Sequence, residues 1–141
     1  NFTSLLALSF YIPAILGVRY IPALVLSFFI TDLFIGFHEV TFFTWGSVIF
    51  IGLASKLFIS TVITRISGAL LGACLFYIIT NFGVWSLGSY GYTFNGLLLS
   101  YTLAIPFFTY SLISTFFFSS IIETIYKFKT IKKFISIYSN K

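Results

Sequence analysis

Residues 23–37, ALVLSFFITDLFIGF, place one carboxylate, Asp32, in an otherwise apolar stretch of chain. The composition of the whole chain is equally apolar, because 59% of its 141 residues are hydrophobic and only 8% are charged. A soluble domain carries about 25% charged residues. The chain could not cover a water-facing surface, which excludes a soluble globular protein. It is predicted to be an all-α, polytopic transmembrane helical bundle that contacts the lipid bilayer.

Five apolar segments of the chain are predicted to be membrane spans, since about 17–25 helical residues cross the hydrocarbon core. The last segment is too long for one simple span, and it contains Pro106, which disturbs a helix interior. We expect this segment to form two short helices, or a kinked or surface-lying piece followed by one span. The predicted spans cover residues 2–18, 20–37, 41–58, 66–87 and 94–126, broken at Pro106.

Basic residues predict how the bundle is oriented. Five of the eight lie in the tail 127–141, and Lys and Arg gather on the cytoplasmic side of membranes. With five spans, Arg19, Lys56 and Arg65 fall on the same side as the tail, whereas six spans would place all three outside. The sequence therefore predicts one transmembrane domain followed by a basic cytoplasmic tail. Such a tail is ordinary in membrane proteins and does not indicate a nucleic-acid partner.

Asp32 then lies about five residues, or about 8 Å, from the outer end of the second span. No Lys or Arg falls in the outer half of the chain, so the carboxylate needs a hydrogen-bond partner, a proton or a bound ligand. The other rare polar groups and several aromatic residues fall in the same outer layer, as an externally open small-molecule site would require. The candidate ligand-binding residues are Asp32, His38, Trp45, Asn81, Trp85 and Tyr90.

Each of these candidates has a simpler interpretation. Asp32 and Asn81 could hydrogen-bond each other and fix the register of two helices. The tryptophan and tyrosine residues could form an interfacial belt, which is common at this depth, and His38 could be a solvated loop residue. One His beside one Glu is not a ligand set, so no metal site is predicted, and no catalytic residue is assigned. Cofactors stay unknown.

Gly68 and Gly72 form a G-x-x-x-G pattern in the fourth predicted span. Small residues at this spacing allow another helix to approach closely. That helix could belong to this chain or to a coupling subunit.

Several motifs together resemble a family of small bacterial membrane proteins of uncharacterised function. The motifs are NFTSLLALSF (1–10), ITDLFIGFH (30–38), TWGSV (44–48), SGALLGACLFYIITNFGVW (67–85) and GLLLSYTLAIPFF (96–108). Ser4 stands where the family usually has proline, and Ser100 where it often has cysteine. The resemblance implies a bacterial plasma-membrane protein with a further helix before Asn1, making six spans with both ends cytoplasmic. That architecture is similar to the S components of energy-coupling-factor vitamin transporters.

Two functional hypotheses follow. The first is a substrate-binding or uptake subunit with an externally open pocket for a small, vitamin-like compound. The second is a non-catalytic accessory subunit of a larger membrane complex, favoured by the small size and by the tail, where Phe128, Ile131, Phe134 and Ile135 recur at helical spacing. An intramembrane enzyme is disfavoured, since the chain offers no paired carboxylates for acid–base chemistry.

Overall fold

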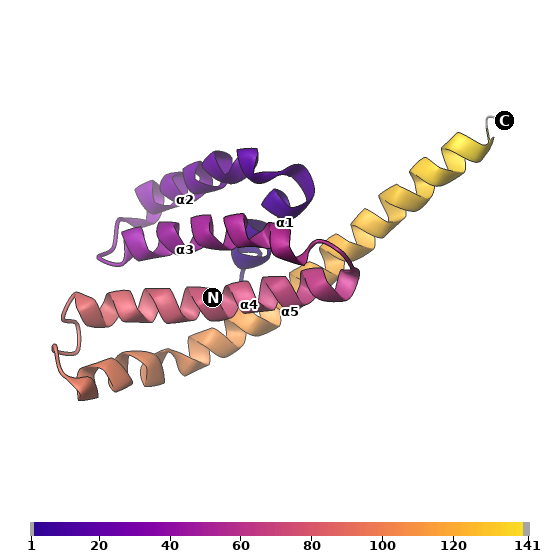
Figure 1. Ribbon diagram of the computed structural model, residues 1–141. Helices are drawn as coiled ribbons and strands as arrows, with labels where there is room; N and C mark the ends of the chain where they lie inside the picture. The colour runs from indigo at the N-terminus through magenta and orange to yellow at the C-terminus, as the bar shows by residue number, and fades with distance from the viewer. Residues whose placement is uncertain (1, 140–141) are drawn as a thin grey trace.

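The computed structural model describes the backbone of residues 2–139 and the side chains of residues 2–130 and of Lys133. This part of the chain is all-α and contains no strand, which confirms the predicted fold class. Two short 3-10 turns, Val18–Tyr20 and Ser55–Phe58, join neighbouring helices. The helices are α1 (Leu5–Leu16), α2 (Ile21–Ile35), α3 (Thr41–Ala54), α4 (Val62–Ser86) and α5 (Phe94–Ser139), as Figure 1 shows.

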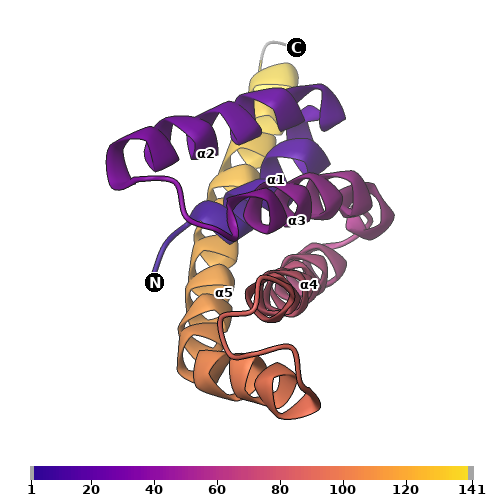
Figure 2. The same ribbon diagram turned by 90° about the vertical axis from the view of Figure 1, so that its left-hand side faces the viewer.

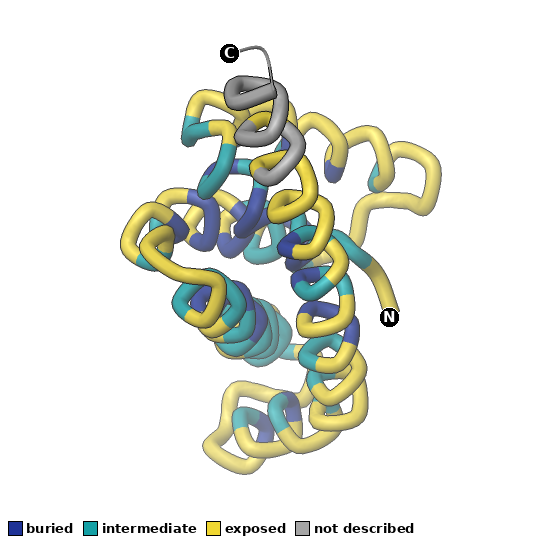
Figure 3. Tube along the Cα trace, turned by 90° about the vertical axis from the view of Figure 1, so that its right-hand side faces the viewer, coloured by how far each residue is buried: buried dark blue, intermediate teal, exposed yellow. Residues whose placement is uncertain are grey.

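The short helix α1 lies at the centre of the bundle and packs against α3, α4 and α5. Its Phe10 and Tyr11 are almost fully buried, and they contact a core completed by Ile51 of α3 and by Ala69 and Ala73 of α4. Figure 3 shows that buried residues gather where the helices face one another and that the outer faces are exposed. The core is therefore narrow and depends on α1.

The outside of the bundle is apolar. Phe34 and Ile35 of α2 and Phe42 of α3 are each at least 80% exposed. An exposed apolar surface of this extent is expected where lipid, and not water, surrounds the helices. Four helical segments are long and apolar enough to cross a membrane, namely Val18–Ile35, Thr41–Phe58, Val62–Ser86 and Phe94–Thr130.

Helix α1 is the shortest of the five, and unlike α2 and α3 it is not extended to 18 residues by an adjoining 3-10 turn. Its 12 residues span about 18 Å at 1.5 Å per residue, whereas the hydrocarbon core is about 30 Å thick. The predicted first span, 2–18, is therefore longer than the helix that forms there. The helix ends where Gly17 adopts a positive φ of 106°.

Helix α5 is continuous, although its sequence predicts a break at Pro106. Its 46 residues include that proline and no interruption of the helix, and Figure 2 shows a bend in the first part of α5 instead. Proline removes one backbone donor and crowds the preceding turn, which bends a helix when neighbouring helices hold both sides in place. At about 69 Å, α5 is long enough to project beyond the bundle, as Figure 1 shows.

Both ends of α4 are set by local chemistry. At its start the Thr61 side chain accepts a hydrogen bond from the Thr64 backbone, and the Thr64 side chain accepts one from the Thr61 backbone, a reciprocal capping box. At its other end the chain turns through Gly88 and Gly91, both with positive φ, before α5 begins. The turn brings α5 back alongside α4, and these two helices share the largest interface of the bundle.

Glycine residues 68 and 72 of α4 lie at contacts with other parts of this chain. A Cβ atom on Gly68 would come within 2.7 Å of Phe10 of α1 and of the Phe58 Cβ, and one on Gly72 would meet Ile51 of α3 at 3.0 Å. The two glycines thus allow α1 and α3 of the same molecule to approach α4 closely.

Candidate ligand-binding cavity

A cavity of about 740 Å³ opens between two halves of the bundle. One side is the C-terminal end of α2 with the loop that follows it, and the other is formed by the facing parts of α4 and α5. The N-terminal segment around Thr3 and Leu6 contributes a third wall. Pockets for small molecules usually measure about 300–1,000 Å³, so the cavity can hold a compound of that size.

Asp32 lines this cavity from the last turn of α2, where Gly36 ends the helix with a φ of 104°. Its Oδ2 atom accepts a hydrogen bond of 2.9 Å from Nε1 of Trp45 on α3. Trp45 itself is absent from the cavity wall and packs edge-on against Phe29, Phe37 and Phe42. The Trp45 indole therefore holds the Asp32 carboxylate through a residue that is not itself part of the cavity wall.

Two further predicted residues, His38 and Asn81, also line the cavity. Nδ1 of His38 lies 2.6 Å from the Thr41 hydroxyl, which orients the ring. Nδ2 of Asn81 donates to the backbone carbonyl of Tyr77, one turn earlier on α4, at 2.8 Å. Asp32 and Asn81 form these bonds and no bond with each other, so the suggested Asp32–Asn81 pair does not fix the register of the helices.

Aromatic rings form much of the wall on the side of α4 and α5. Tyr77 stacks on Phe108 with ring centroids 4.3 Å apart. The hydroxyl of Tyr77 donates to the backbone of Tyr101, and the hydroxyl of Tyr101 donates to the backbone of Ile78, so the two helices exchange hydrogen bonds beside the cavity. This wall is therefore held in place from both helices.

Trp85 and Tyr90 lie apart from the cavity, at the turn between α4 and α5. The indole Nε1 of Trp85 donates to the Thr93 carbonyl at 3.0 Å and closes that turn. Tyr90 is 40% exposed in the same turn. Of the six candidates from the sequence, the structure thus brings three to the cavity, places one directly behind it and leaves two elsewhere.

Sequence reasoning missed several hydroxyl groups that line the cavity together with these residues. Thr31 precedes Asp32, Thr80 precedes Asn81, and Ser111 reaches the wall from α5. Their proximity to Asp32 and Asn81 in the sequence was the available signal for the two threonines. No comparable signal marked Ser111, because its position depends on how α5 is rotated about its axis.

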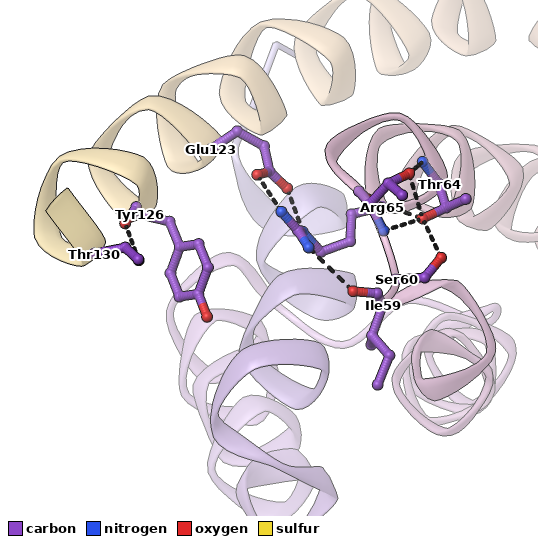
Figure 4. Close-up of polar contacts among 8 residues, drawn as sticks. Ile59, Ser60, Thr64, Arg65, Glu123, Tyr126 and Thr130 are labelled. Carbon is purple, nitrogen blue, oxygen red and sulfur yellow. Dashed lines mark hydrogen bonds and ion pairs between the residues drawn. The ribbon is translucent and has the colours of Figure 1, made fainter. Parts of the chain in front are cut away.

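A second polar cluster, also missed from the sequence, lies toward the opposite end of the bundle. Nε and Nη2 of Arg65 on α4 donate to the two carboxylate oxygens of Glu123 on α5, at 2.6 and 2.7 Å, and Nη1 donates to the Ile59 carbonyl at 3.0 Å (Figure 4). The guanidinium carbon lies 5.6 Å from the centre of the Tyr126 ring. This bidentate pair ties the start of α4 to the middle of α5.

Three further buried hydroxyl groups belong to Tyr11 of α1 and to Thr115 and Ser119 of α5. The Thr115 hydroxyl has no hydrogen-bond partner among the described residues, whereas the Tyr11 hydroxyl lies within interaction range of both the Ser119 hydroxyl and the Glu123 carboxylate. Thr115, Ser119 and Glu123 are spaced four residues apart, and therefore share one face of α5. That face also carries Ser111, so polar groups extend along α5 from the cavity toward the ion pair.

The described residues contain no group of three or more His, Cys, Asp or Glu side chains that could hold a metal ion. The polar chemistry of the cavity consists of one carboxylate, one imidazole, one carboxamide and several hydroxyls. Such a set can orient a small molecule by hydrogen bonds.

The fold and its apolar exterior define a multi-pass, all-α membrane protein with a cavity between its helices. Residues 1–137 match the family of unknown function DUF6580, and the chain belongs to this family. The comparison with curated proteins and that with solved structures gave no match.

Proposed function

We propose that this protein binds a small, ring-containing compound in the cavity and serves as a substrate-binding or uptake subunit. The observation that carries the proposal is the convergence of Asp32, His38 and Asn81 on one cavity of about 740 Å³ with aromatic walls. Few precisely placed polar groups in an otherwise apolar pocket are typical of small-molecule sites. The resemblance to S components of vitamin transporters points to the same class of function, with a vitamin-like compound as the ligand.

The proposed orientation in a bacterial plasma membrane has the cavity open to the outside and the basic end in the cytoplasm. It is supported by the connectivity of the helices. Arg19, Lys56 and Arg65 lie at the α1–α2 and α3–α4 junctions, whereas Asp32 and His38 lie at the α2–α3 end. The Arg65–Glu123 pair joins the second half of α5, which carries Lys127 and Lys129, to the start of α4, and this supports the same orientation. Lys and Arg favour the cytoplasmic side.

Energy for uptake would come from a partner subunit or an ion gradient, and we propose no enzymatic activity for the protein. Helix α5 supplies the surface on which a partner could act, since it extends beyond the bundle at the basic end (Figure 1). The same helix supports the second candidate function, a non-catalytic accessory subunit in a larger membrane complex. The amphipathic pattern predicted for the tail involves Ile131, Phe134 and Ile135, whose side chains lie outside the described residues.

Native mass spectrometry of the protein, extracted gently from its own membrane, tests this proposal. We expect a co-purified small molecule in the wild type, and its loss in Asp32→Asn, because the variant keeps the shape of the side chain and removes its charge. Glu39→Gln is the matched control, since Glu39 is an exposed carboxylate outside the cavity. Stoichiometric protein partners without any small molecule would favour the accessory subunit instead.

A further inference from the structure

Only one of the two carboxylate oxygens of Asp32 accepts a hydrogen bond from another described residue. Oδ2 of Asp32 accepts the bond from Trp45, and among the described residues no group donates to Oδ1. Asp32 is partly exposed and lines the cavity. A carboxylate fixed on one side by an indole N–H and free on the other is an acceptor directed at whatever occupies the cavity.

No side chain that lines the cavity carries a permanent positive charge. The imidazole of His38 is the one basic group in the wall, and its Nδ1 is engaged with Thr41. Arg65, by contrast, forms an ion pair with Glu123 at the other end of the bundle. A carboxylate at Asp32 therefore has no permanently charged basic side chain of the cavity wall as its counter-ion.

The aromatic rings in the cavity wall also bear on the charge of the ligand. Phe28 and Phe37 contribute rings from the α2 side, and Tyr77, Phe107 and Phe108 contribute rings from the other side. The face of an aromatic ring is electronegative and attracts a cation placed within about 6 Å of its centre. A cation in the cavity would thus gain from the carboxylate and from any ring that turns its face toward it, whereas an anion would be repelled by the carboxylate.

We propose that the ligand of this cavity is a small organic monocation, either a protonated amine or a cationic nitrogen heterocycle with an apolar body. This inference rests on the proposed function and specifies its substrate class. Asp32 pairs with the positive nitrogen, the aromatic rings surround the apolar body, and Asn81 and the neighbouring hydroxyls orient the remainder. A neutral donor would satisfy Oδ1 by a hydrogen bond, but it would not compensate the charge.

A matched pair of dyes tests the charge requirement. The probes are a fluorescent dimethylaminostyryl N-methylpyridinium dye and its neutral parent pyridine, which lacks only the N-methyl group. Binding is titrated by fluorescence in nanodiscs of zwitterionic lipid, at a pH where the parent is unprotonated, with wild type, Asp32→Asn and Glu39→Gln. We expect the cation to bind the wild type and Glu39→Gln about tenfold more tightly than the neutral dye, and Asp32→Asn to lose that preference.

The outcomes separate this inference from the proposed function. Equal binding of both dyes, a preference for the neutral dye, retention of the cation preference in Asp32→Asn, or no binding of either dye would overturn the organic-cation class. The proposed function is judged independently by the co-purified compound. It stands if a neutral compound is lost in Asp32→Asn, and it fails if no compound depends on Asp32.

Discussion

Breaking the Arg65–Glu123 pair is expected to destabilise the protein strongly, and Glu123→Gln is the substitution that measures this cost. The side chains of the two residues are only 13% and 7% exposed, and both carboxylate oxygens are bonded. Two unit charges about 4 Å apart attract by about 4 kcal/mol at an effective dielectric constant of 20. Glutamine keeps the shape but leaves the Arg65 charge buried and uncompensated, and breaking a buried pair in this way costs about 3–5 kcal/mol.

We therefore expect Glu123→Gln to lower the free energy of unfolding by about 3 kcal/mol, the lower end of that range, since the amide oxygen can still accept one bond. Denaturant unfolding in detergent micelles, followed by tryptophan fluorescence, measures the change. Glu39→Gln, which alters an exposed carboxylate, is the control and should change stability by less than about 0.5 kcal/mol. A loss below about 1 kcal/mol for Glu123→Gln, the range of exposed ion pairs, would refute the reasoning.

Two further stability predictions use the same unfolding assay. Gly68→Ala should destabilise the protein by about 1–3 kcal/mol by overpacking, because its Cβ would lie 2.7 Å from neighbouring side chains. Gly46→Ala, where the Cβ meets nothing within 4 Å, should be neutral or stabilising. An equal loss of stability in Gly68→Ala and Gly46→Ala would contradict the packing argument. Thr115→Val should raise stability by about 1 kcal/mol, because it removes a buried hydroxyl without a partner. Ser114→Ala removes a hydroxyl that donates to the Ser111 carbonyl and should not raise stability. A loss of stability in Thr115→Val would contradict the reasoning that the Thr115 hydroxyl is buried without a partner.

Much of the fold was predictable because hydropathy is a local property of the chain. Each apolar segment of about 17–25 residues predicts a helix wherever the others lie, and five helices form at the expected places. The lengths were less predictable. Residues near Pro13 and Gly17 end α1 early, whereas α5 continues through Pro106 because α4 supports it.

For the candidate site, the sequence predicted only the depth in the membrane at which its residues lie. The sequence places Asp32, His38 and Asn81 at one depth with Trp85 and Tyr90, since distance along a helix gives depth at 1.5 Å per residue. The distance along a helix does not give the rotation of that helix about its axis. Helix α2 is apolar on all sides, so no polar stripe in its sequence reveals which face carries Asp32 into the cavity.

The sequence by itself thus determined that this protein is an all-α membrane bundle with its rare polar groups near one end and its basic groups at the other. Only the tertiary structure decided which of those groups meet. It separated Trp85 from the cavity, moved Trp45 behind Asp32, and joined Arg65 to Glu123 across 58 residues of sequence. The reason is physical, because contacts between helices depend on side-chain packing across interfaces, and packing is not a property of any one segment.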